Sequence, residues 1–135
     1  MKPTADDGAG WPHVWRVIEH DGVSWEPKSR RGTGLRKRRT KACFTNCATH
    51  PRLMDGTYRY CEGLARADHE HDWWVHHAWL VDPEGHAIDV TWSEPGAAYF
   101  GIAFAWDQTF CRTMTASYTD GRMFGGVLEY LAWSR

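Results

Sequence analysis

Alternating apolar and polar positions mark the middle of the chain as β-structure. The segment "TYRYCEG" at 57–63 alternates between two faces, and "WWVHHAWLVD" at 73–82 and "GHAIDVTW" at 85–92 are β-prone. The Pro-Glu-Gly sequence between the last two segments is typical of a tight turn. We therefore predict one strand, then a hairpin, and then a further strand at "AAYFGIAF", residues 97–104.

Helices are predicted on both sides of these strands. The sequence "KACFTNCATHP" suits a short helix over about 42–50, because Thr40 is a good N-cap and Pro51 disfavours helical backbone in the residue before it. The stretch at 107–133 is interpreted as two helices. Near the N-terminus, the Asp-Gly pair at 21–22 lies between two apolar runs and indicates a hairpin of two short strands.

This order of elements predicts the fold class. Antiparallel strands with helices segregated toward the two ends of the sequence are typical of an α+β domain. We expect a central antiparallel β-sheet with a Cys-bearing helix packed on it. The 135 residues suit one compact domain. In it, residues 1–40 form an N-terminal tail, the hairpin and a basic arm, and residues 41–135 form the catalytic-like α+β part.

Positive charge is concentrated in the predicted arm. The net charge of −1 argues against a surface built wholly for nucleic acid or for an anionic membrane. Yet "KSRRGTGLRKRRTK" at 28–41 is dense in basic residues and holds no acidic one. Such a run is either a solvated loop or a non-catalytic binding module for nucleic acid or an acidic partner. Its candidate contacts are Arg30, Arg31, Arg36, Lys37, Arg38 and Arg39.

The chain shows no apolar leader and no stretch that approaches the length of a membrane span. We therefore expect a cytoplasmic protein without a membrane partner. Thiols stay reduced in the cytoplasm, so the cysteines need an explanation other than a disulfide framework. Most of them suit small, buried apolar positions. The sequence leaves the oligomeric state open.

One cysteine carries signals of chemistry. Cys43 falls in the first turn of the predicted helix, where the helix dipole and the preceding basic residues favour a thiolate. Cys47 lies one turn later, gains less from the dipole, and remains open as a second candidate thiol. A nucleophilic cysteine needs a base, and the base needs a group that orients it.

The predicted hairpin offers both of these groups. A turn centred on Pro83 and Glu84 without a bulge places His77 opposite Asp89, with Cβ atoms about 5 Å apart. The carboxylate then accepts the imidazole N–H and holds the ring. Adjacent residues of a strand point to opposite faces, so His76 is expected at the surface of the hairpin.

The ordered set "CFTN…YRYCEG…HHAWLVDPEGHAIDVTW…YFGIAF" resembles a family of small bacterial and phage proteins. More broadly, it resembles transglutaminase-like and papain-like cysteine enzymes. The resemblance covers about residues 41–104 and implies Cys43 as nucleophile, His77 as base and Asp89 as the orienting group. Asn46 and Glu62 match positions of the family motif, without an established role.

The predicted activity is cysteine-dependent hydrolysis or acyl transfer at an amide-type bond, including an isopeptide bond or a glutamine side chain. The substrate is then a protein, a peptide or a small acyl compound, and no cofactor is required. Asn46 and Glu62 either support the site or make ordinary local contacts. Trp79 and Trp92 are expected in the core or in the wall of a substrate pocket.

A zinc site is the main alternative. The segment "DHEHDWWVHH" at 68–77 offers imidazole and carboxylate ligands shortly after a cysteine, and these are suitable ligands for zinc. The spacing matches no standard structural zinc pattern, which favours the cysteine enzyme. The alternative ligand set is His69, His71, His76 and Cys61.

Overall fold

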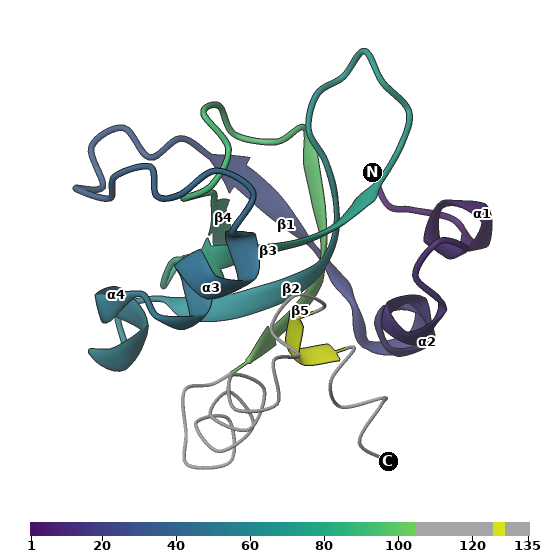
Figure 1. The fold of residues 1–135 in the computed structure, drawn as a ribbon, viewed down its shortest axis with the longest axis horizontal. Helices are drawn as coiled ribbons and strands as arrows, with labels where there is room; N and C mark the ends of the chain where they lie inside the picture. The colour runs from purple at the N-terminus through teal and green to yellow at the C-terminus, as the bar shows by residue number, and fades with distance from the viewer. Residues whose placement is uncertain (105–125, 129–135) are drawn as a thin grey trace.

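Five strands close into a barrel in a computed structural model of the protein, which describes residues 1–104 and 126–128 (Figure 1). The strand order is β1-β4-β3-β2-β5, and β5 pairs with β1 to close the ring. All pairs are antiparallel except β1 with β4, which is parallel. The strands are β1 Val23–Lys28, β2 Arg59–Arg66, β3 Val75–Val81, β4 His86–Ile88 and β5 Ala98–Phe104.

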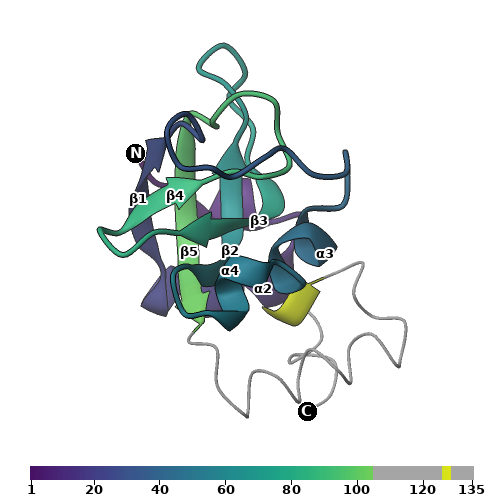
Figure 2. The same ribbon diagram turned by 90° about the vertical axis from the view of Figure 1, so that its left-hand side faces the viewer.

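Two pairs of short helices lie on different sides of this barrel (Figures 1 and 2). α2 packs against β2 and β5, and α3 packs against β3. No helix within the described residues is both long enough and apolar enough for a membrane span. The helices are α1 Ala5–Gly8, α2 Pro12–Asp21, α3 Cys43–Ala48 and α4 Pro51–Met54.

Two paired glycines allow β2 and β5 to approach closely. Gly63 lies opposite Gly101 in the antiparallel ladder. A Cβ on Gly63 would lie 2.2 Å from the carbonyl oxygen of Phe100, and a Cβ on Gly101 would lie 2.3 Å from the carbonyl oxygen of Glu62. Glycine is therefore required on both strands where their backbones come together.

The two faces of the strands carry different apolar clusters. On β3, Trp79 and Val81 pack with residues of the other strands, including Cys61 and Tyr99. Residues of the opposite face of the strands, such as Leu80, pack against the helices. The period of two along a strand thus sorts side chains between these clusters.

The predicted papain-like α+β fold with a central antiparallel sheet is wrong. The N-terminal part of the chain supplies β1, which pairs with both β4 and β5 and closes the sheet into a mixed barrel. This pairing joins residues that are distant in sequence, and local patterns do not report it. Residues 1–40 therefore contribute a strand to the barrel rather than only a tail and an arm.

The predicted N-terminal hairpin is also wrong. Residues 12–21 form α2, in which Val14 and Ile18 lie one turn apart and are both buried. Pro12 suits the first turn of a helix because its missing N–H would have no helical partner there. Only the second half of the predicted hairpin is a strand, and it is β1.

The other strand predictions are confirmed as β2, β3, β4 and β5, although β4 ends at Ile88, earlier than expected. The predicted helix at 42–50 is present as α3, and Pro51 starts a separate short helix instead of simply ending the first one. The predicted helices at 107–133 lie outside the described residues except for 126–128, which are helical.

Candidate active site

A buried histidine and a buried aspartate form the centre of the site. The Nε2 atom of His77 lies 2.8 Å from the Oδ2 atom of Asp89. The exposed fractions of the two residues are 3% and 2%. The predicted contact between them is therefore confirmed, while their catalytic roles remain a prediction.

The hairpin register behind this contact differs from the predicted one. Leu80 pairs with Ile88, and Val81 with Ala87, so His77 is not directly opposite Asp89. The register is shifted by two residues, and a shift by an even number keeps both side chains on the same face. β4 has ended before Asp89, and the carboxylate reaches His77 diagonally.

Asp89 is held by four donors among the described residues. Its Oδ1 atom accepts the backbone N–H groups of Thr91 and Trp92, each at 2.9 Å. Its Oδ2 atom accepts the hydroxyl of Tyr99 at 2.8 Å as well as the imidazole of His77. Burial alone would raise the pKa of Asp89, but His77 and the backbone donors lower it. The carboxylate is therefore fixed and ionised.

The imidazole of His77 is held in place by stacking as well as by Asp89. Its ring lies 3.9 Å from the ring of Trp92, centroid to centroid, with 15° between the planes. Burial by itself would lower the pKa of His77, but the Asp89 carboxylate and an interaction with the Cys43 thiol raise it to about 9. The imidazolium form is therefore favoured at neutral pH, as in a thiolate–imidazolium pair.

Cys43 is the first residue of α3 and brings the thiol to this imidazole. Since Nε2 of His77 faces Asp89, Nδ1 is the ring nitrogen left for exchange of a proton with the thiol. Cys43 is half-buried and lines a cavity of about 440 Å³, which we call the Cys43 cleft. The described lining of this cleft is the segment 39–45.

The competing thiols are not accessible. Cys47 and Cys61 are fully buried, and burial raises the pKa of both thiols well above its ordinary value. The Asp89 carboxylate raises the pKa of Cys47 further. Among the described cysteines, Cys43 is thus the one that both contacts the imidazole and meets solvent.

Asn46 is a positioning residue for the start of α3. Its side-chain amide donates to the carbonyl oxygen of Arg39 at 2.7 Å and to the hydroxyl of Thr91 at 2.9 Å. Arg38 donates back to the carbonyl oxygen of Asn46 at 2.9 Å. These bonds tie the segment before Cys43 to the segment that follows Asp89, so Asn46 links two parts of the candidate triad.

Glu62 and His76 form a second pair, on the opposite face of β3 from His77, in which Glu62 is buried and His76 is partly buried. The Oε2 atom of Glu62 lies 2.9 Å from Nε2 of His76, and Oε1 accepts the hydroxyl of Tyr60 at 2.6 Å. The backbone N–H groups of Val127 and Leu128 also donate to this carboxylate. The expectation that His76 lies at the surface is wrong, because its side chain is only 5% exposed.

The two tryptophans have different positions. Trp79 is fully buried, and its indole N–H has no hydrogen-bond partner in the part of the chain that the structure describes. It is a core residue and does not line the Cys43 cleft. Trp92 stacks directly on His77 and is part of the site.

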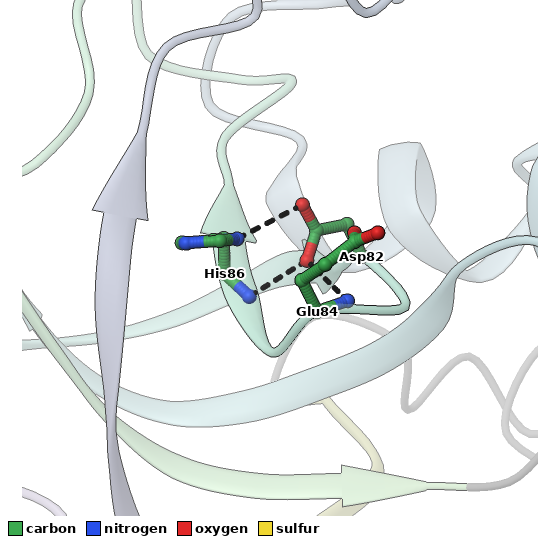
Figure 3. Close-up of side chains that lie close together, drawn as sticks. All are labelled: Asp82, Glu84 and His86. Carbon is green, nitrogen blue, oxygen red and sulfur yellow. Dashed lines mark hydrogen bonds and ion pairs between the residues drawn. The ribbon is translucent and has the colours of Figure 1, made fainter.

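The alternative zinc ligands are not brought together. His71 bonds to Asp68, His76 bonds to Glu62, and Cys61 packs in an apolar cluster. Within the described ranges, metal-ligating side chains come together in a group of three only at Asp82, Glu84 and His86 (Figure 3).

This group is explained by the turn between β3 and β4. Asp82 accepts the backbone N–H groups of Glu84 and His86 and bonds to Nδ1 of His86 at 3.2 Å. Lys28 forms an ion pair with the same carboxylate at 3.5 Å. Asp82 therefore stabilises the turn, and these bonds explain why the three side chains lie together without requiring a metal ion.

The basic arm lies against the barrel for part of its length. Arg30 donates to the carbonyl oxygen of Ser93 at 2.9 Å, and the backbone N–H of Arg38 donates to the carbonyl oxygen of Val90. Leu35 is buried in the cluster that includes α3. The exposed basic residues of the arm are Lys28, Arg31, Arg36, Lys37, Arg39 and Lys41.

Comparison with known protein families, curated proteins and solved structures finds no match to this chain.

The sequence did not predict Tyr99 as a partner of Asp89. The only signal for it is the alternation of the β5 strand, which does not identify which residue of another strand it faces.

Proposed function

We propose that this protein is a cysteine-dependent hydrolase or acyltransferase that acts on an amide-type bond. The observation that supports this proposal is the buried His77–Asp89 pair, whose imidazole interacts with Cys43, the described thiol that opens onto a cleft. A nucleophile, a base in contact with it and a third group that orients the base are the parts that covalent catalysis requires.

In the proposed reaction, Cys43 and His77 form a thiolate–imidazolium pair in which the thiol proton is held on Nδ1 of His77, and the thiolate attacks the carbonyl carbon of the substrate. The imidazolium then gives its proton to the leaving amine as the C–N bond breaks. The product is a thioester on Cys43. Water or a second amine, deprotonated by His77, attacks the thioester and releases the thiol.

Asp89 and Trp92 act through the imidazole in this proposal. Asp89 stabilises the positive charge that His77 carries during the reaction, and its own position is fixed by Tyr99 and backbone donors. Trp92 covers one face of the ring. The site is therefore organised before substrate binds, which is the condition for efficient catalysis.

The proposal is tested by alkylation of each cysteine with iodoacetamide at pH 7, followed by mass spectrometry. We expect Cys43 to react at least about tenfold faster in the wild type than in His77→Gln, because the imidazole removes the thiol proton. Cys47→Ala provides the control and should leave the Cys43 rate unchanged. Equal Cys43 rates with and without His77, in proteins with the same circular dichroism spectrum, would contradict the proposal.

A further inference from the structure

The Cys43 cleft has a positively charged wall. Arg39 and Lys41 both line it and are both exposed. Neither side chain forms an ion pair with any of the described residues. The described lining, residues 39–45, contains no acidic side chain, so the positive charge beside the thiol is not compensated locally.

A third cation lies at the same wall. The Nζ atom of Lys37 donates to the hydroxyl of Thr40, which lines the cleft, at 3.0 Å. Arg38 differs from these residues because its side chain is bonded to the carbonyl oxygen of Asn46. Arg38 and Lys37 are thus bonded within the segment, whereas the side chains of Arg39 and Lys41 form no ion pair with the described residues.

The backbone of this wall is held in a defined conformation. The carbonyl oxygen of Arg39 accepts the buried amide of Asn46 at 2.7 Å. Lys41 has a φ of 61°, which is unusual for a residue other than glycine, asparagine or aspartate. Such backbone persists where the surrounding structure maintains it.

We infer that the Cys43 cleft selects acyl substrates that carry an oxyanion, either a carboxylate or a phosphate, close to the bond that is attacked, and that Arg39 and Lys41 bind this group. The inference rests on the proposed function, since it assigns a substrate class to the same thiol. Guanidinium and ammonium groups are the side chains that proteins use for both oxyanions. The described lining also includes Phe44 and Thr45, which carry no charge. Arg39 and Lys41 are therefore the charged side chains of this lining that an anionic substrate would meet.

The test compares alkylation of Cys43 by iodoacetate and by iodoacetamide, which differ mainly in one negative charge. Both reagents react with the same thiolate, so the ratio of their rates does not depend on how much thiolate is present. The experiment therefore remains informative even if His77 proves not to activate Cys43. The ratio is measured at pH 9 in the full chain and referred to the ratio for 2-mercaptoethanol, a neutral thiol.

We expect the ratio at Cys43 to exceed the reference about fivefold, the effect of one cation at contact distance in water. It should fall to the reference value in the Arg39→Gln/Lys41→Gln variant and decrease with added salt. Arg16→Gln is the matched control, because it removes a positive charge from the exposed face of α2 and should change nothing. A wild-type ratio equal to the reference, or a ratio unaffected by the double variant, would overturn the inference.

A second measurement identifies the oxyanion. Sodium acetate and sodium phosphate are added at equal ionic strength, and protection of Cys43 from iodoacetamide is followed in the wild type and the double variant. Protection by either anion that is lost in the double variant supports the inference and indicates which group is preferred. Absence of protection by both anions at concentrations up to 100-fold above that of the reagent would count against it.

Discussion

His77 and Asp89 are 2.8 Å apart although the hairpin register does not place them opposite each other. The carboxylate reaches the imidazole because β4 ends at Ile88 and the next residues fold back over the carboxylate. Asp89 therefore couples the end of the hairpin to β3, and through His77 to Cys43 on α3. Substitutions at this position test the site most directly.

Replacing Asp89 with asparagine should separate orientation from charge. The Asp89→Asn variant removes the negative charge beside His77, so we expect the Cys43 alkylation rate at pH 7 to fall at least about tenfold. The free energy of unfolding should fall by about 3 kcal/mol, because the variant breaks a buried ion pair. Iodoacetamide labelling and urea unfolding measure the two effects.

Tyr99→Phe is the matched control for this prediction. It removes one donor to Asp89 and keeps the carboxylate and the imidazole. We expect a loss of about 1–2 kcal/mol in unfolding free energy and a Cys43 rate within a factor of about three of the wild type. A larger loss of reactivity in Tyr99→Phe than in Asp89→Asn would contradict the assigned role of Asp89.

The raised pKa of His77 predicts a pH dependence of stability. Its value of about 9 in the folded protein exceeds the ordinary 6.5, so folding favours the protonated ring. This contribution is fully present below about pH 6.5 and is lost as the pH rises through about 9, and it amounts to about 3 kcal/mol at most. The difference in unfolding free energy between wild type and His77→Gln should shrink across this range.

Urea unfolding of wild type and His77→Gln at intervals between about pH 6 and about pH 9.5 measures this difference. A difference that stays constant over this range would show that the ring is not held as an imidazolium.

The two cysteines of α3 should behave oppositely. Cys43→Ser should retain the fold and lose rapid alkylation, since Cys43 is half-buried at the cleft. Cys47→Ala should retain the reactivity of Cys43 and lose about 1 kcal/mol of stability, because Cys47 is fully buried in the cluster under α3. Peptide mapping after labelling and urea unfolding distinguish the two outcomes, and labelling of Cys47 in the folded protein would exclude this assignment.

Glu62 should hold residues 126–128 against the barrel. The Glu62→Gln variant replaces one oxygen of a buried carboxyl group that bonds to His76 and to the backbone of Val127 and Leu128. We expect a loss of about 3 kcal/mol and faster hydrogen exchange at the two backbone amides. Glu70→Gln, at an exposed position, should change neither quantity. Unchanged protection of Val127 in Glu62→Gln would show that the carboxylate is not the attachment point.

Gly126 tests the same contact from the other side. A Cβ at this position would lie 2.6 Å from Oε2 of Glu62, and the residue has a φ of +79°. Gly34 has the same φ with open space around it, so alanine there measures only the backbone penalty of about 1–2 kcal/mol. We expect Gly126→Ala to be more destabilising than Gly34→Ala by about 1–3 kcal/mol in urea unfolding. Equal losses would mean that the carboxylate moves aside without cost.

The alternation of side chains along the chain predicted β2 to β5 and the shared face of His77 and Asp89. The period of two is a property of the strand itself, and it survives an error of two residues in the hairpin register. The helix that carries Cys43 was predictable in part. His50 before Pro51 is extended as expected, but the predicted N-cap Thr40 is wrong, because the helix starts after Ala42 without a side-chain cap.

Only the tertiary structure decided the barrel and the surroundings of the site. β1 closes the sheet by pairing with β4 and β5, and Asp89 receives the hydroxyl of Tyr99 from β5. His76 meets Glu62 from β2 and the ring of Phe44 from α3. These contacts join segments that are far apart in the sequence, and a local pattern shows which face a residue occupies without showing what it meets there.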